Sequence, residues 1–141
     1  MFEAGFNSLL ANSPAIAAEL GGSPFARADG ASGVFPEQLP EASTLPACVY
    51  NVVGYQNVKS NEGTNRLVKK RVQVDCYGRH YGDAKFLQDA IRETVLSFKG
   101  TLSDGTLVCQ AWLNSELDAF EDAPFLFCAV LDFDVWIINQ A

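Results

Sequence analysis

The sequence lacks the short motifs of common catalytic sites, and it has very little histidine. Among its 141 residues it has a single histidine, His80. It contains no Walker loop, no GxGxxG fingerprint, no H-E-x-x-H zinc motif and no G-x-S-x-G nucleophile elbow. A Ser–His–Asp or Cys–His centre would have to be built around His80, which lies in the polar stretch GRHYG. We therefore expect His80 to be a surface or turn residue, and we expect neither an enzyme nor a cofactor.

The chain also lacks a long hydrophobic segment and a basic N-terminus. No run of 18 or more apolar residues occurs, so we expect no membrane-spanning helix. A signal peptide begins with basic residues, whereas this chain carries Glu3 and has no basic residue before Arg27. We therefore expect synthesis in, and retention by, a reducing cytoplasm.

Cysteine is scarce and is not spaced for metal binding. The four cysteines are Cys48, Cys76, Cys109 and Cys128, and no two of them form a C-x-x-C pair. All four lie in apolar, strand-like runs. Metal ligation and disulfides stay open, but buried free thiols are the interpretation that this pattern and a cytoplasmic setting favour.

Basic residues are absent from residues 101–141, which hold seven acidic side chains. Residues 59–80, by contrast, hold six basic and two acidic side chains. The net charge of −7 makes the chain a poor candidate for a nucleic-acid-binding protein, which needs basic surface for phosphate. Two interpretations of the uneven charge are compatible with each other. The basic segment of one copy contacts the acidic segment of another, or the two segments pair within one sheet.

The best-defined elements are a strand and a helix in residues 66–100. Apolar residues at period two form one face of the strand (Val68, Val72, Val74 and Cys76), and polar residues form the other (Lys69, Arg71, Gln73 and Asp75). Lys70 interrupts the apolar face, where its aliphatic stem can lie on apolar surface. After Tyr77-Gly78 the period changes to three or four residues, which predicts a helix with one apolar stripe: Ala84, Leu87, Ile91, Val95 and Phe98.

Further elements precede this unit. Residues 2–20 predict an N-terminal helix, kinked or divided in two, because Ser13 suits a cap and Pro14 a first turn. Residues 21–46 are rich in Pro and Gly and predict an extended segment with a very short strand at Val34-Phe35. Residues 47–58 predict a long strand, with Tyr55 on the face away from Cys48, Tyr50 and Val52, and Gly54 suits a bulge.

Residues 57–66 predict a projecting hairpin with a polar tip at 59–65. The tip is either a solvated turn or a finger that becomes ordered against a partner.

Two strands are expected at the end of the chain, at 106–117 and 125–138, joined by an acidic connection at 118–124. The first is expected to direct Leu107, Cys109, Ala111 and Leu113 to one side. Both faces of the last strand are largely apolar, so the N-terminal helix or another subunit must cover the second face. Trp112 and Trp136 are candidate interface anchors there. Asp132 and Asp134 share one face, where solvent-facing charge is favoured over a shared metal or an acid/base pair.

These elements predict one domain over residues 1–141. Its hydrophobic content of 48% argues against disorder, and its length allows a sizeable core. The fold class is α+β: a mainly antiparallel sheet of about four long strands, with an N-terminal helix and one long central helix packed on it.

The order of these pieces resembles the tail completion, or tail terminator, family of long-tailed bacteriophages and related prophage elements. The matching pieces cover almost the whole chain. They are the N-terminal helix ending at Leu20-Gly21; Val34-Phe35-Pro36 and Leu39-Pro40; Thr44-Leu45-Pro46 leading into Val49-Tyr50; Val72-Gln73-Val74-Asp75-Cys76-Tyr77; Tyr81, Asp83-Ala84, Leu87 and Asp89-Ala90-Ile91; Phe98 with Gly100; and Leu131-Asp132-Phe133 with Trp136.

The resemblance implies a structural virion protein at the head–tail junction. Such a protein assembles as a homo-oligomer, typically a hexameric ring, that caps the head-proximal end of the tail tube and stops its polymerisation. Its partners would be the major tail tube protein and the head-tail connector or stopper protein, while DNA passes through the ring without sequence-specific binding. Two alternatives stay open: another neck component, such as a head-side stopper or adaptor, and a soluble small-ligand-binding α+β protein.

Candidate partner-contact residues come from the hairpin, the basic strand and the last strand. They are Asn57, Lys59, Asn61, Glu62, Asn65, Arg66, Lys69, Arg71, Asp132, Asp134 and Trp136. No catalytic, cofactor-binding or metal-binding residue is expected.

Overall fold

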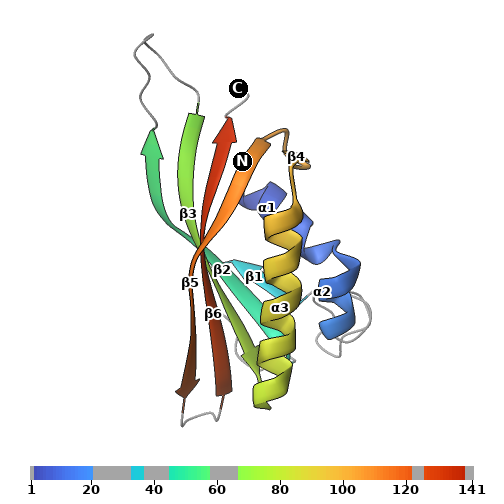
Figure 1. Cartoon of the computed structure of the whole chain (residues 1–141). Helices are drawn as coiled ribbons and strands as arrows, with labels where there is room; N and C mark the ends of the chain where they lie inside the picture. The colour runs from blue at the N-terminus through green and yellow to red at the C-terminus, as the bar shows by residue number, and fades with distance from the viewer. Residues whose placement is uncertain (1, 21–32, 37–44, 58–66, 122–125, 139–141) are drawn as a thin grey trace.

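In a computed structural model, the described part of the chain folds as one curled sheet with three helices (Figure 1). The structure describes residues 2–20, 33–36, 45–57, 67–121 and 126–138, and the statements below concern these residues. The helices are α1 (Phe2–Ala11), α2 (Pro14–Glu19) and α3 (Tyr81–Ser97). The strands are β1 (Val34–Pro36), β2 (Ala47–Asn57), β3 (Leu67–Gly78), β4 (Gly100–Thr101), β5 (Leu107–Glu121) and β6 (Leu126–Ile138).

The sheet has six strands in the order β1-β2-β3-β6-β5-β4. Four of them are the long strands that the sequence predicts, and every pair among these four is antiparallel. The expectation of about four strands in an antiparallel sheet is wrong in detail, because short strands extend both edges. β1 pairs with β2 in the parallel direction, and β4 pairs with only the first two residues of β5. The mixed α+β class is confirmed.

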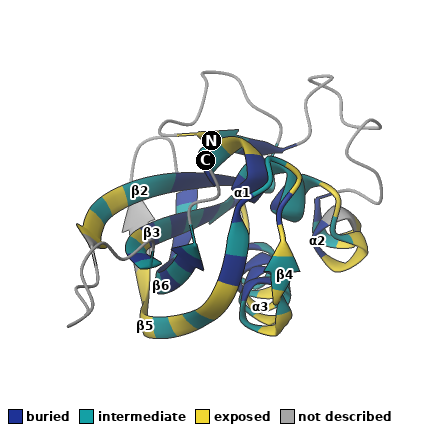
Figure 2. Cartoon of the chain, turned by 90° about the horizontal axis from the view of Figure 1, so that it is seen from above, coloured by how far each residue is buried: buried dark blue, intermediate teal, exposed yellow. Residues whose placement is uncertain are grey.

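All three helices lie on one side of the sheet, and the core lies between these two layers (Figures 1 and 2). The predicted stripe of α3 is buried there, except that Phe98 is half-buried. It meets the apolar faces of β3 and β6, whose buried residues include Val72, Val74, Leu131, Phe133 and Ile137. Full burial of one such side chain stabilises a fold by roughly 1.5–3 kcal/mol. The alternation along β3 and β6 therefore fixes which sheet face the helices cover.

Lys70 lies at the margin of this core, as predicted. Its ammonium group lies 5.3 Å from the ring centroid of Phe2 and 5.7 Å from that of Tyr55. The same group lies 3.8 Å from the Glu3 carboxylate. The charge thus stays at the surface between two aromatic rings, while the stem crosses apolar surface.

The N-terminal segment forms two helices, separated at the predicted cap. The Ile16 backbone N–H donates to the Ser13 hydroxyl at 3.4 Å, and Pro14 begins α2. The Ser13 and Thr94 hydroxyls lie 3.0 Å apart and join this break to α3. In α1, Phe6 packs edge-on against Tyr50 of β2 with ring centroids 5.6 Å apart. Burial raises the pKa of the Tyr50 hydroxyl.

Bulges correct several predicted side-chain directions. The register of β2 shifts between Val52 and Gly54, which confirms the bulge and turns Tyr55 to the helix-covered face, opposite Lys70. A shift between Val108 and Gln110 likewise exposes Cys109 and buries Val108, contrary to the expectation that all four cysteines are buried. The other three cysteines are buried and free, and burial raises the pKa of the Cys76 thiol well above its ordinary value.

Other boundaries differ from prediction or lie outside the described residues. β5 continues to Glu121, so residues 118–121 belong to a strand and not to an acidic connection. β2 and β3 pair up to Asn57 and Val68, as a hairpin requires, whereas its tip at 58–66 lies outside the described residues. Most of the extended segment 21–46 is also outside them. Among the described helices, none combines the length and apolarity needed to cross a bilayer.

Two glycines give a matched test of this packing. In α1, a Cβ on Gly5 would collide with Asp104 and lie 2.8 Å from the Leu102 Cβ atom, whereas on Gly82 of α3 it would meet only the Phe86 ring at 3.6 Å. Gly5→Ala is therefore expected to lower the free energy of unfolding by about 1–3 kcal/mol. Gly82→Ala is expected to be neutral or to raise it by up to about 1 kcal/mol. Urea unfolding of both variants checks this, and equal midpoints would contradict the proposed contact of α1 with the 102–104 turn.

Candidate assembly surface

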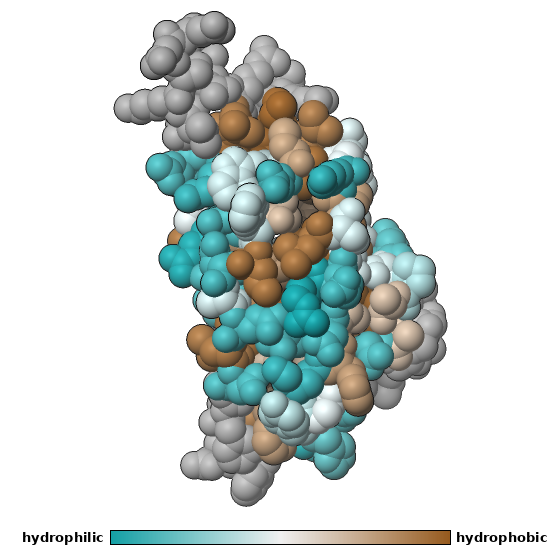
Figure 3. Space-filling view, viewed as in Figure 1, coloured by the Kyte–Doolittle hydropathy of each residue, from teal (hydrophilic) through white to brown (hydrophobic). Residues whose placement is uncertain are grey.

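The sheet face opposite the helices, here called the outer face, carries the charged and aromatic side chains that the sequence singles out. Its side chains come from alternate residues of β3, β6 and β5. The register forms three rows across β3, β6 and β5. They are Lys69 with Trp136 and Gln110, Arg71 with Asp134 and Trp112, and Gln73 with Asp132 and Ser115. Basic residues of β3 thus lie beside acidic residues of β6. The space-filling view from the side of β5 and α3 shows apolar patches separated by hydrophilic bands (Figure 3).

Arg71 and Asp132 form the closest ion pair on the outer face. The Arg71 Nη2 and Nε atoms donate to Asp132 Oδ2 at 2.6 and 3.0 Å, and Nε also reaches Oδ1 at 3.1 Å. Asp132 is only 8% exposed, so its charge depends on these bonds. The hydrogen bonds from Arg71 to Asp132 raise the pKa of the guanidinium group.

A second, looser cluster lies in the neighbouring row, around Lys69 and Trp136. The Lys69 ammonium group is 4.0 Å from the Asp134 carboxylate and 5.9 Å from the ring centroid of Trp136. Trp136 in turn packs edge-on against Trp112 of β5, with centroids 6.2 Å apart. Trp112 remains 54% exposed, although tryptophan side chains are highly buried on average.

The structure thus brings five predicted contact residues together on the outer face: Lys69, Arg71, Asp132, Asp134 and Trp136. Asn57 ends β2, while Lys59, Asn61, Glu62, Asn65 and Arg66 lie outside the described residues. Of the two interpretations of charge, pairing within one sheet is observed for Lys69 and Arg71. Asp132 and Asp134 face these bases, and the described residues hold no group of three or more His, Cys, Asp or Glu side chains arranged for a metal ion.

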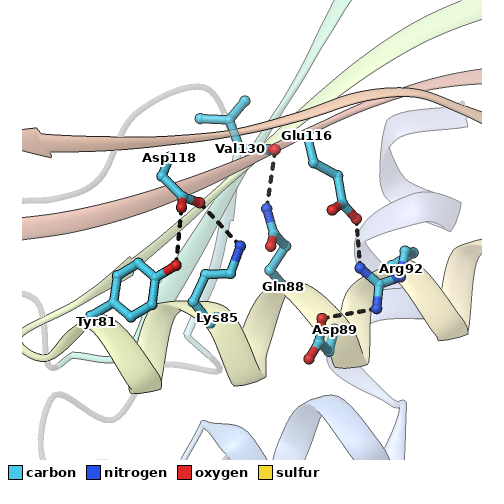
Figure 4. A network of polar contacts seen from close by, with 8 residues as sticks. All are labelled: Tyr81, Lys85, Gln88, Asp89, Arg92, Glu116, Asp118 and Val130. Carbon is cyan, nitrogen blue, oxygen red and sulfur yellow. Dashed lines mark hydrogen bonds and ion pairs between the residues drawn. The ribbon is translucent and has the colours of Figure 1, made fainter.

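A polar network that the sequence did not reveal joins α3 to β5 (Figure 4). The Asp118 carboxylate accepts hydrogen bonds from the Tyr81 hydroxyl and the Lys85 ammonium group, each at 3.1 Å. About two turns beyond Lys85, Arg92 donates to Glu116 at 2.6 Å and to Asp89 at 2.8 Å. Bonding to Asp118 raises the pKa of Lys85, and bonding to Glu116 raises the pKa of Arg92. Two patterns in the sequence are consistent with this network. The donors on α3 recur at helical spacing, and the acids Glu116 and Asp118 are two residues apart on β5.

Gln88 is the buried polar residue at the centre of this network. Its side chain is fully enclosed, and Nε2 donates to the Val130 carbonyl at 3.2 Å (Figure 4). Its Oε1 atom has no hydrogen-bond partner among the described residues. The bond ties α3 to the centre of β6.

The hollow beside this network does not resemble a ligand site. It has a volume of about 250 Å³, lies at the start of α3 and is lined by Tyr81, Ala84, Lys85, Asp118, Phe127, Cys128 and Ala129. Its volume is below the usual range of small-molecule pockets, and its polar groups bond to one another. His80, outside this lining, is an exposed residue at the start of α3 that forms no side-chain cap.

The two ion pairs of the outer face are expected to differ in their contribution to stability. Arg71→Met leaves the enclosed Asp132 charge without three hydrogen bonds, whereas Lys69→Met removes a looser contact from Asp134. Urea unfolding at pH 7 should therefore show a larger loss for Arg71→Met. Adding Asp132→Asn should recover part of that loss, because the amide carries no charge. Equal losses in the two single variants would refute the distinction.

Comparison with known proteins agrees with the resemblance seen in the sequence. The family described as tail completion protein gp17 matches residues 7–138. Among solved structures, a chain from the virion of a native gene transfer agent particle superposes with a TM-score of 0.68 at 13% sequence identity. The alignment covers 97% of this chain and 94% of that chain. No curated protein matches.

The solved relative shares the fold over nearly its entire length, and the family match extends from α1 to the end of β6. The family match points to a structural component of a virion, and the superposition shows the shared fold. The chain belongs to the tail completion protein gp17 family.

Proposed function

We propose that the chain caps the head-proximal end of a phage tail tube as a homohexameric ring. In that position it ends polymerisation of the tube protein and provides the surface that joins the tail to the head connector. The observation that carries this proposal is the match to the tail completion family over residues 7–138.

The geometry of the sheet supports a ring. A closed ring of identical subunits needs two different patches that fit each other, one on each side of the subunit. The two sides of this sheet are different: one ends in β2 with the short parallel β1, and the other ends in β5 with the two-residue β4. A ring built through these sides has two unlike faces. One face binds the last layer of tube protein, and the other binds the connector or stopper.

Partner contacts follow from this arrangement. The hairpin at 57–66 reaches a neighbouring subunit or the tube, and the outer-face residues Lys69, Arg71, Asp132, Asp134 and Trp136 contribute further contacts. Since both basic side chains lie beside carboxylates and the net charge is −7, DNA passes through the ring without specific binding. The chain is made in the bacterial host cytoplasm and then joins the particle.

The proposal is tested by electron microscopy of particles assembled without the gene. Uncapped tubes continue to grow and offer no docking surface, so overlong tails lacking heads are expected. Complementation with the wild-type gene serves as the control. Headless tails of normal length would instead favour another neck component, such as a stopper or adaptor, and normal infectious particles would contradict both functions.

A further inference from the structure

Two of the four cysteines lie directly opposite each other in the sheet. The register pairs Cys48 of β2 with Cys76 of β3, and both side chains are fully buried in the core on the helix-covered face. Cys128 of β6 is opposite Tyr77, the residue after Cys76, so its side chain leaves the other face of the sheet. Cys109 of β5 is exposed. The fold therefore brings Cys48 and Cys76 together and keeps the other two cysteines apart from them.

The backbone hydrogen bonds bring this pair closer than the average cross-strand pair. The Cys48 N–H group donates to the Gly33 carbonyl at 2.8 Å, on the side of β1. The backbone groups of Cys48 thus point to β1 and not to β3, which makes Cys48 and Cys76 a non-hydrogen-bonded pair. Opposite Cα atoms in such a pair are about 4.5 Å apart. A disulfide needs a Cα–Cα separation of about 4.4–6.8 Å and side chains on the same face, and this position meets both conditions.

We propose that Cys48 and Cys76 form an intrachain disulfide that links β2 to β3 once the chain leaves a reducing environment. In this structure both are reduced thiols. The bond itself does not depend on the capping ring, but the setting in which it forms rests on the proposed function. A chain that is made in the cytoplasm and carried by a virion meets oxidising conditions after the particle is released.

The oxidant is a small-molecule disulfide, such as oxidised glutathione. One cysteine thiolate attacks a sulfur atom of the oxidant, which forms a mixed disulfide and releases one small thiolate. The other cysteine thiolate then attacks the protein sulfur of the mixed disulfide, which forms the bond between Cys48 and Cys76 and releases the second small thiolate. Two electrons pass from the cysteine sulfurs to the oxidant, and the two cysteine protons end on the released thiols.

Burial makes this reaction slow. Neither side chain is exposed, and burial raises the pKa of the Cys76 thiol well above its ordinary value, so little thiolate is present. The exposed Cys109 is therefore expected to react with a thiol reagent first. The pair stays reduced during synthesis and assembly, and it is oxidised during the longer lifetime of the released particle.

The bond stabilises the fold by constraining the unfolded chain. It closes a loop of residues 49–75, which includes the predicted hairpin at 57–66. A cross-link across such a loop lowers the conformational entropy of the unfolded state. The oxidised chain is therefore expected to have a Tm about 5–15 °C higher than the reduced chain.

Peptide mapping tests whether the bond forms. A Cys109→Ser chain, which lacks the exposed thiol, is incubated with oxidised glutathione under native conditions for several days. It is then denatured, alkylated and digested with trypsin, which cleaves between the two cysteines, for example after Lys69. A linked pair of peptides containing Cys48 and Cys76 is expected, about 2 Da lighter than the two reduced peptides together. Absence of this linked pair, or a link to Cys128 in its place, would overturn the inference.

Thermal unfolding gives a matched control in the same Cys109→Ser background. Cys128→Ala keeps the opposed pair and Cys76→Ala removes it, although both shorten a buried cysteine. Oxidation should raise the Tm of the Cys128→Ala chain and leave that of the Cys76→Ala chain unchanged. If Cys76→Ala does not fold, Cys48→Ala removes the same pair. A Tm of the Cys128→Ala chain that does not respond to oxidation contradicts the stabilising link.

The failures of this inference and of the proposed function are distinguishable. Particles released from cells should contain the linked peptides, and particles taken from inside cells should contain the reduced ones. An isolated chain that forms the bond, with released particles that lack it, overturns the proposed setting. A bond absent from the isolated chain overturns the inference and leaves the capping function intact. Normal infectious particles made without the gene overturn the capping function and leave the bond intact.

Discussion

The packing of α3 on the central strands β3 and β6 is the interaction on which the rest of the structure depends. Leu87 and Ile91 of the helix and Leu131 and Phe133 of β6 are all fully buried, and Gln88 adds a hydrogen bond to the β6 backbone. Since β6 pairs with β3 on one side and β5 on the other, a helix fixed to β6 fixes the centre of the sheet. The long outer strands β2 and β5 are then held along their inner sides, and the short strands β1 and β4 pair with part of their other sides.

Electrostatic interactions reinforce this arrangement locally. The acidic C-terminal strands find their bases within the same chain: Asp132 with Arg71, Asp118 with Lys85, and Glu116 with Arg92. Single ion pairs at the surface contribute little to stability. The pairs of Asp118 with Lys85 and of Glu116 with Arg92 therefore hold β5 against α3 through their number and geometry. A consequence is that much of the charge that the sequence distributes unevenly is paired within one chain.

Much of the fold could be predicted from the sequence, because local periodicity determines it. The period-two pattern of β3, the period of α3, the break at Ser13-Pro14 and the short strand at Val34-Phe35 are all observed. Bulges limit this approach. Gly54 marks one of them, but the bulge that exposes Cys109 contains no glycine, and one extra residue reverses every later side chain. The sequence predicts a connection at the acidic end of β5, because its partners Lys85 and Arg92 come from a distant helix. For the candidate surface, the period-two patterns predict which side chains of β3 and β6 share a face. They do not predict which strands are neighbours, because the strand order depends on pairing between distant segments.

The central proposal is that copies of this chain close a ring on the end of a tail tube. Analytical ultracentrifugation of the chain, alone and after addition of tail tubes, tests it most directly. A capping ring predicts a ring-sized oligomer in at least one of these two conditions. A chain that stays monomeric in both would contradict the proposal.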